Sequence, residues 1–207
     1  MGLREKKKQQ TRQNALKASA KLFQDQGFAA TSMDQIATKA MVSRTTLFNY
    51  FSSKDAIVLA LAEPFENSYP KKVREICSKA GTTAQRIEAS LAAAAEYFMR
   101  HRALNEAIYL ELKRIRSTEH EANRSAYDGY HSAFSELLDL GMEQGDVRTD
   151  VEKDRMSELL YLPITSGIYR IFNDGDDDID KTFRSYATLL TSAITIGDDK
   201  APTRKQR

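Results

Sequence analysis

The sequence predicts an all-α protein with an N-terminal helix-turn-helix domain and a larger C-terminal helical domain. Apolar residues recur at steps of three and four along most of the chain, which is the spacing of one face of an α-helix. Charge is divided unevenly, because residues 1–54 hold ten Lys and Arg against three Asp and Glu, while the whole chain nets only +2. A basic end joined to an acidic remainder is typical of a phosphate-binding module attached to a second domain.

The composition narrows the class of protein. A chain of 207 residues with 41% hydrophobic residues is long and apolar enough to bury a core. The single cysteine, Cys77, excludes an internal disulfide and a multi-cysteine zinc site, so we expect a small buried side chain there. The charged N-terminus lacks the apolar segment of a signal peptide, and no apolar run approaches the length of a bilayer crossing. We therefore expect a cytoplasmic protein that does not enter membranes.

The chain is expected to begin with a polar, basic arm over residues 2–12, which is either solvated or placed near DNA. The first helix follows and runs to Gln26. Gly27 supplies a glycine stop, and Phe28 places an apolar residue behind it. This helix is expected to form a scaffold across the back of the next two.

The stretch that follows carries the start signals of two short helices. Thr31 and Asp34 have the spacing of a capping box, and a single apolar stripe comes after them. Ser43 is placed to cap the second helix, with Val42 and Leu47 as a hydrophobic staple. Two short helices separated by a three-residue break predict a helix-turn-helix.

The outer face of the second short helix carries side chains that can bind DNA. Leu47 and Phe51 share its buried side. Arg44 is the first choice for a guanine and Asn49 for an adenine, because each can form a bidentate pair with that base edge. Phe48 either touches a base or packs partly into the core. The predicted base contacts are Arg44, Thr45, Phe48 and Asn49, and the predicted phosphate contacts are Thr31, Thr46, Tyr50 and Lys54.

These residues occur in an order that resembles the TetR family of bacterial transcriptional regulators. The resemblance is specific over roughly the first sixty residues and diffuse beyond them. It departs from the family at Met41, where the family usually has a glycine, so we expect a left-handed methionine strained by roughly 1 kcal/mol. The residues that carry the resemblance are Gly27-Phe28, Thr31-Ser32-Met33, Ile36-Ala37, Val42-Ser43, Thr46-Leu47-Phe48, Tyr50-Phe51 and Ser53-Lys54-Asp55.

After Lys54 the periodicity predicts a long helix, in which Pro64 and Pro70 should cause a bend. Further helices are expected over about residues 84–101, 104–116, 120–144, 151–172 and 179–196. The predicted domains are residues 1–54 for the helix-turn-helix, residues 55–197 for ligand binding and dimerisation, and residues 198–207 as a disordered tail.

The last two predicted helices, residues 151–172 and 179–196, are apolar over more than one face. A helix with two apolar sides needs a second partner to cover it. Two such hairpins that meet across a two-fold axis would form a four-helix interface, so we expect a homodimer. The family resemblance implies the same interface.

Aromatic side chains are unusually frequent on the helices after residue 81. Each of them is either plain core or the lining of a ligand cavity between helices. The resemblance implies an inducer cavity in this half of the chain, and we expect a largely apolar one with a few hydroxyl groups. The candidate lining residues are Tyr97, Phe98, His101, Tyr109, Tyr130, Phe134, Tyr161, Tyr169 and Phe172.

The sequence contains no pattern that is typical of an enzyme. His101, His120 and His131 are widely spaced, and the HExxH, paired-cysteine, Walker and GxSxG motifs are missing. We therefore expect no catalysis, no metal site and no cofactor.

The leading interpretation is a homodimeric repressor that occupies a palindromic double-stranded DNA operator and leaves it when a small, largely apolar effector binds. Two recognition helices about 34 Å apart would read such an operator. One alternative is a DNA-binding protein whose C-terminal domain recruits a protein partner and senses no ligand. Another is a nonspecific DNA compactor, whose affinity would depend on salt but not on sequence.

Overall fold

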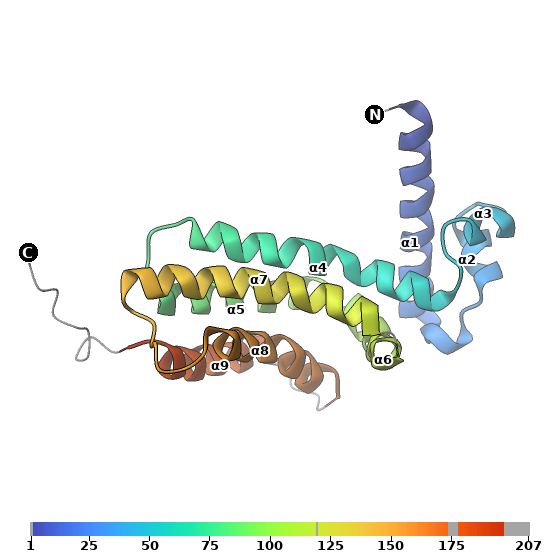
Figure 1. The fold of residues 1–207 in the computed structure, drawn as a ribbon. Helices are drawn as coiled ribbons and strands as arrows, with labels where there is room; N and C mark the ends of the chain where they lie inside the picture. Colours follow the sequence, from blue (N-terminus) through green and yellow to red (C-terminus); the bar gives the residue numbers. More distant parts are fainter. Residues whose placement is uncertain (1, 119, 174–177, 197–207) are drawn as a thin grey trace, which may run out of the picture. The chain divides into compact units, whose positions relative to one another are not determined.

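The computed structural model describes residues 2–118, 120–173 and 178–196, and it folds them into nine α-helices (Figure 1). The prediction of an all-α protein is confirmed, and the predicted tail at 198–207 lies outside the described residues. None of the described helices combines the length and the hydropathy that a membrane crossing requires. The helices are α1 (Leu3–Ala30), α2 (Met33–Lys39), α3 (Arg44–Phe48), α4 (Lys54–Cys77), α5 (Thr83–Arg100), α6 (Arg102–Thr118), α7 (His120–Gln144), α8 (Lys153–Asn173) and α9 (Ile179–Ile194).

The helices form two compact units. The N-terminal unit holds the residues up to 64 together with residues 101–123, and the C-terminal unit holds residues 65–100 with the described part of residues 124–207. Helix α4 contributes its first turns to the N-terminal unit and its remaining turns to the C-terminal unit. This division differs from the boundary predicted after residue 54, because α6 packs with the N-terminal helices.

Helix α1 begins earlier than the sequence suggested. The predicted basic arm at residues 2–12 is wrong from Leu3 onward, where the chain is already helical. The glycine stop is confirmed, because Gly27 has a φ of 80° that breaks the regular helix. A left-handed backbone of this kind costs glycine little and other residues more. Gly27 thus turns the chain towards α2.

The core of the N-terminal unit is built from fully buried side chains of several helices. Phe23 of α1, Ile36 of α2 and Leu47 of α3 are each at most 1% exposed. Ile57 of α4 and Ile115 of α6 close the same cluster. Helix α6 belongs to this unit because its apolar stripe packs against α1.

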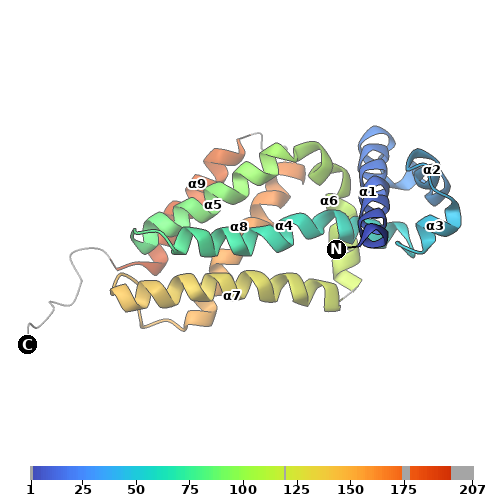
Figure 2. The same cartoon turned by 90° about the horizontal axis from the view of Figure 1, so that it is seen from above.

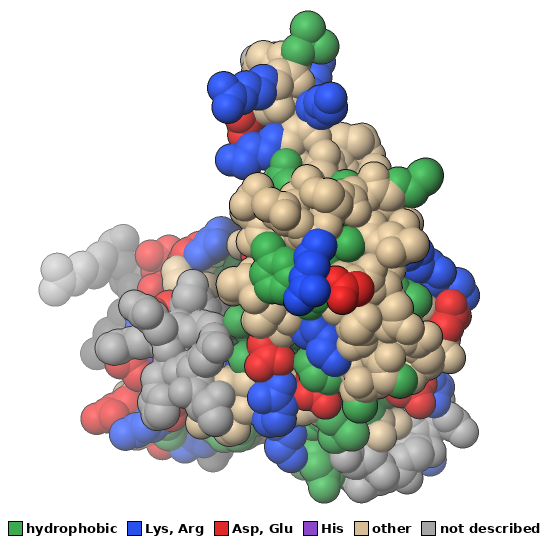
Figure 3. Space-filling view, turned by 90° about the vertical axis from the view of Figure 1, so that its right-hand side faces the viewer, with side chains coloured by type: hydrophobic (Ala, Val, Ile, Leu, Met, Phe, Trp, Pro, Cys, Tyr) green, Lys and Arg blue, Asp and Glu red, His purple; other side chains and the backbone are tan. Residues whose placement is uncertain are grey.

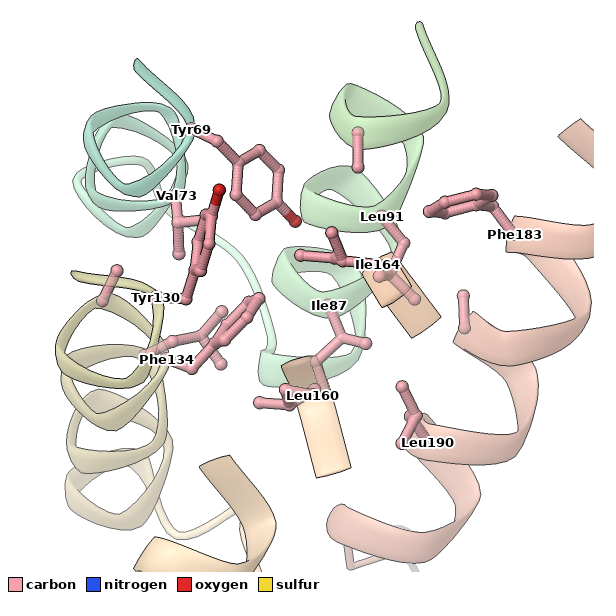
Figure 4. Packing of buried hydrophobic residues seen from close by; sticks show 14 of the residues in the cluster. Tyr69, Val73, Ile87, Leu91, Tyr130, Phe134, Leu160, Ile164, Phe183 and Leu190 are labelled. Atoms are coloured by element: carbon pink, nitrogen blue, oxygen red, sulfur yellow. The ribbon is translucent and has the colours of Figure 1, made fainter. Parts of the chain in front are cut away.

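In the C-terminal unit, α5 packs along α9 and α8 contacts both helices (Figure 2). Figure 4 shows Tyr69 of α4, Leu91 of α5 and Phe134 of α7 pointing into one common core. Gly167 allows α8 to approach α9 closely, since a Cβ atom there would lie 2.7 Å from the Phe183 ring.

The prolines predicted to bend the long helix do not interrupt it. Helix α4 continues through both Pro64 and Pro70 as far as Cys77. Pro163 is likewise accommodated inside α8. Proline removes one backbone donor and crowds the preceding turn, but tertiary packing can hold the rest of the helix in place.

Cys77, at the end of α4, is half-buried, and burial raises the pKa of its thiol.

Candidate DNA-binding interface

Helix α2 is opened by a capping box one residue later than predicted. The Ser32 hydroxyl accepts from the Gln35 amide at 3.2 Å, and the Gln35 side chain accepts from the Ser32 amide at 2.7 Å. The predicted pairing of Thr31 with Asp34 is therefore wrong. Both pairs have capping-box spacing, and the neighbouring pair forms because Thr31 is the C-cap residue of α1 and is buried.

The turn between α2 and α3 confirms the left-handed methionine. Met41 has a φ of 55° and is 85% exposed. Its amide donates to the Thr38 carbonyl at 3.1 Å, and the Val42 amide donates to the Ala37 carbonyl at 3.0 Å. These bonds satisfy carbonyls at the end of α2, which offsets the strain of a side chain in this region.

Helix α3 is held by a cap at its start and by apolar anchors beneath it. The Ser43 hydroxyl accepts from the Thr46 amide at 3.0 Å, as the sequence predicted. Leu47 is 0% exposed and Phe51 is 3% exposed, so both are locked into the core. With this side of α3 fixed, its rotation about its own axis is fixed as well.

The four predicted base contacts all lie on the exposed face of α3 and its C-terminal end. Arg44, Thr45 and Asn49 are exposed, and Phe48 is 40% exposed. At 40% exposure Phe48 combines partial packing with an outward-facing surface, so a base contact by its ring stays a prediction. This outward set combines a guanidinium, a hydroxyl, an aromatic ring and an amide, which together can pair with base edges and touch a thymine methyl group.

Arg44 is held in place by two neighbours on the same surface. Its Nε atom lies 3.3 Å from Asp34 Oδ1, and the centre of its guanidinium lies 5.5 Å from the centroid of the Phe48 ring. The side chains of Arg44 and Asp34 are 67% and 62% exposed, so water screens the pair. An ion pair of this kind stabilises by about 1 kcal/mol or less, which leaves the guanidinium free to exchange Asp34 for a base.

Two of the predicted phosphate contacts are used inside the protein instead. Lys54 Nζ donates to the Phe28 carbonyl at 2.7 Å and to the Thr31 carbonyl at 2.6 Å. It also lies 4.2 Å from the centroid of the Phe28 ring. Thr31 is 2% exposed, and its hydroxyl donates to the Gly27 carbonyl at 2.8 Å. Lys54 therefore acts as a brace between the kinked end of α1 and the start of α4.

The other two phosphate candidates, Thr46 and Tyr50, are half-buried and remain at the edge of the outward face.

On the side of the molecule shown in Figure 3, blue side chains gather at the top, on the first turns of α1. Arg4, Lys6 and Lys7 are exposed there. The basic residues predicted as an arm thus form a helical surface.

Sequence reasoning missed one support of this domain. Arg12 donates through Nη2 to both carboxylate oxygens of Glu63, at 2.9 and 3.1 Å. Its guanidinium also lies over the Phe51 ring at 5.5 Å. These contacts tie α1 to α4 and to the residue that anchors the end of α3. Arg12 and Glu63 are 51 residues apart in the chain, so no local sequence pattern predicts this ion pair.

The structure places the nine predicted ligand-lining residues in different surroundings, and their role in binding a ligand stays a prediction. Phe98, Tyr130 and Phe134 are at most 4% exposed and pack in the core of the C-terminal unit. The Tyr161 ring stacks on Tyr130 with centroids 5.2 Å apart, and Phe172 packs against the same core. Tyr169 is 42% exposed. Among the rest, His101 and Tyr109 belong to the N-terminal unit, and Tyr97 lines a surface groove.

Comparison with known proteins agrees with this geometry. The family model described as "Bacterial regulatory proteins, tetR family" matches residues 15–61, which contain α2, α3 and the start of α4. The transcriptional repressor NicS of Pseudomonas putida is 27% identical over 100 residues, which are 48% of this chain and 47% of NicS. The transcriptional activator FasR of Mycolicibacterium smegmatis is 33% identical over 76 residues, which are 37% of this chain and 35% of FasR. The chain thus matches half or less of the length of either relative.

Solved structures match over most of the chain. The TetR-family repressor FadR of Thermus thermophilus, in complex with lauroyl-CoA, has a TM-score of 0.70 and 24% identity. That match covers 92% of this chain and 98% of FadR. The FadR regulator of Bacillus subtilis, in complex with stearoyl-CoA, has a TM-score of 0.72 at 18% identity, over 88% of this chain and 98% of that one. At these identities the likeness establishes the fold.

Proposed function

We propose that this chain, a member of the TetR family of bacterial regulatory proteins, is a transcriptional repressor that binds a palindromic DNA operator and is released by a small molecule. The observation that carries the proposal is the rigid presentation of α3. Leu47 and Phe51 are buried beneath the helix, while Arg44, Phe48 and Asn49 point outward. Such an arrangement is suited to the major groove.

In this proposal each outward side chain has a separate role. Arg44 forms a bidentate pair with a guanine, and Asn49 does so with an adenine. Thr45 and Phe48 contact bases, and a thymine methyl group suits the Phe48 ring. Phosphates are bound at the edge by Thr46 and Tyr50, and by the exposed lysines of α1 rather than by Lys54 or Thr31. Since the partner is genomic DNA, the protein would act in the cytoplasm.

A homodimer through α8 and α9 would present two copies of α3. Large apolar side chains on these helices remain exposed in the single chain, with Leu162 at 51% and Leu189 at 64%. Leu159 and Tyr169 are 40% and 42% exposed. Covering them with a second copy would remove this apolar surface from water and place the two reading helices about one DNA turn, roughly 34 Å, apart.

Release by a small molecule is supported by the ligands of two proteins with a similar fold. Two structural relatives are described in complex with long-chain acyl-CoA esters. We propose that an effector binds the C-terminal unit of this chain and favours a dimer whose recognition helices no longer match the operator spacing. One relative is named as a repressor and another as an activator. We propose a repressor, because repression follows more simply from occupying an operator.

Footprinting on the DNA around the protein's own gene tests the DNA-binding part. A protected two-fold symmetric sequence is the expected result. Binding that falls with salt and protects no particular sequence would instead identify a nonspecific DNA compactor.

Thermal-shift screening followed by an operator-binding assay tests the release. We expect at least one compound that raises the melting temperature and lowers operator affinity, because a ligand of one state shifts the equilibrium towards it. Operator binding that persists across a broad library would favour the alternative in which the C-terminal unit recruits a protein partner.

A further inference from the structure

A surface groove between α4 and α5 lies wholly within the C-terminal unit. It has a volume of about 350 Å³, which is at the lower end of the range for small-molecule sites. Aromatic side chains form its floor and charged side chains form its rim. The residues that line it are Phe65, Ser68, Tyr69, Lys71, Lys72, Glu75, Ala93, Glu96, Tyr97 and Arg100.

The floor is a set of rings that hold one another in place. The Phe65 ring lies 4.6 Å from Tyr97, 5.0 Å from Tyr69 and 4.8 Å from Phe98, measured between centroids. The Tyr69 hydroxyl donates to the Ser90 carbonyl at 3.0 Å, and burial raises the pKa of Tyr69 so that it stays a neutral donor. A floor that is already packed does not have to rearrange when a ligand arrives.

Tyr97 is the ring of this floor that a ligand can reach. It is partly buried against the core, and burial raises the pKa of its hydroxyl group. Its remaining surface faces the groove. Aromatic pairs favour offset-stacked or edge-to-face packing and gain stabilisation beyond the burial of area. A flat aromatic molecule therefore matches this surface better than a flexible alkyl chain does.

The rim carries three cations against two carboxylates. Lys72 lies 3.0 Å from Glu75, and Arg100 forms an ion pair with Glu96. Lys71 is exposed and has no ion-pair partner among the described residues. One positive charge at the edge of the groove is therefore left for a ligand.

We propose that this groove binds an aromatic compound with one negative charge, whose ring lies on Tyr97 and whose anionic group meets Lys71. The inference rests on the proposed function, because it names the chemical class of the effector. The site lies on α4, the helix whose first residue, Lys54, braces the end of α1. A molecule bound at Lys71 contacts α4, a helix that contributes residues to both units.

The binding of 2-naphthoate, an aromatic carboxylate, and of 2-naphthamide, its neutral analogue, tests the proposal. The chain has no tryptophan, so the fluorescence of the naphthalene ring can be followed without that background. We expect Lys71→Gln to weaken 2-naphthoate by about three- to fivefold, the upper range for an exposed ion pair, and to leave 2-naphthamide within twofold. Tyr97→Ala should weaken both compounds, and Lys181→Gln, an exposed lysine of α9, should change neither.

The outcomes separate this inference from the proposed function. Equal 2-naphthoate binding by wild type, Lys71→Gln and Tyr97→Ala, or no binding at millimolar concentration, overturns the groove assignment. If footprinting still finds an operator, the DNA-binding proposal stands. Circular dichroism of each variant shows whether a loss of binding comes from lost folding. Lys71→Arg keeps the positive charge and is expected to restore 2-naphthoate binding, which would assign the loss in Lys71→Gln to the charge.

Discussion

The outward face of α3 and the interior of the C-terminal unit use aromatic side chains in opposite ways. On α3, Phe48 is 40% exposed, and its ring lies beneath the guanidinium of Arg44 at 5.5 Å. In the C-terminal unit, Phe134 is 1% exposed, and its ring meets Tyr69 edge-on at 6.3 Å. An exposed ring beside a cation on a rigid support is available for recognition, whereas a buried ring among rings stabilises the fold.

Phe134→Ala is expected to have the largest effect of the changes considered. Truncating a fully buried phenylalanine costs about 3 to 5 kcal/mol, because the lost burial adds to the cavity that is left. Denaturant unfolding of the variant measures this cost. Met99→Ala, on α5 and 47% exposed, is the control and should change stability by about 0.5 kcal/mol or less. A Phe134→Ala variant with near-normal stability would mean that this ring lines a hollow after all.

Leu47→Ala removes the support of the outward face of α3 without touching that face. Leu47 is 0% exposed, so the free energy of unfolding should fall by about 2 to 5 kcal/mol. Operator binding should be lost as α3 loses its fixed orientation. Leu110→Ala on α6, where the leucine is 63% exposed, makes the same chemical change and should alter neither property. Unchanged operator affinity in Leu47→Ala would contradict the role of this anchor.

Lys54→Ala distinguishes a brace from a phosphate contact. Loss of charge-assisted hydrogen bonds to the Phe28 and Thr31 carbonyls should destabilise the protein by about 1.5 to 3 kcal/mol. The slope of log affinity against log salt should stay the same, whereas a lost phosphate contact would reduce it by about 1. Thermal melting and DNA titrations at several salt concentrations measure both quantities. Lys17→Ala, an exposed lysine of α1, is the charge-matched control for stability.

Arg44→Ala tests the assignment of the outward face. We expect a loss of about 1 to 3 kcal/mol on the operator and a relaxed preference at one base position. Arg4→Ala, at the exposed start of α1, should instead weaken operator and random DNA alike. Competition binding against operators substituted at each position provides the measurement. Equal losses of Arg44→Ala on operator and random DNA would reduce Arg44 to a phosphate contact.

The same comparison explains what could be predicted from the sequence. Ser43, Leu47 and Phe51 act on α3 from within eight positions of one another, so caps and spacing were enough to orient Arg44 and Asn49. The Lys54 brace was missed because its carbonyl acceptors come from residues 28 and 31, where the kink at Gly27 redirects the chain. The capping box was predicted one residue too early. Thr31 and Ser32 both carry hydroxyl groups and are neighbours in the chain, and only their burial determines which of them caps α2.

The aromatic residues after position 81 could not be sorted by sequence for a similar reason. Tyr97 and Phe98 are neighbours on α5, yet one faces a groove and the other is 4% exposed. Phe65 and Tyr69, which complete the groove, come from α4 and precede the residues after position 81 that the sequence predicts as pocket lining. Which ring faces a hollow depends on how the helices pack, and helical periodicity alone does not specify that.

Asp34→Asn should give the smallest effect and addresses how Arg44 chooses its partner. The pair with Asp34 holds the guanidinium on the protein surface at 3.3 Å, so nonspecific phosphates must compete with a carboxylate for it. Removing that carboxylate should raise affinity for random DNA by up to about fivefold, the equivalent of about 1 kcal/mol, and should lower the ratio of specific to random binding.

Asp25→Asn on α1 removes an exposed carboxylate in the same way and measures the general effect of one lost negative charge. In an Arg44→Ala background, Asp34→Asn should do no more than Asp25→Asn does, because the carboxylate then has no guanidinium to hold. Such a double-mutant cycle isolates the coupling between the two side chains. If Asp34→Asn gave the same gain with and without Arg44, the pair would have no part in selecting the operator, and Phe48 alone would position the arginine.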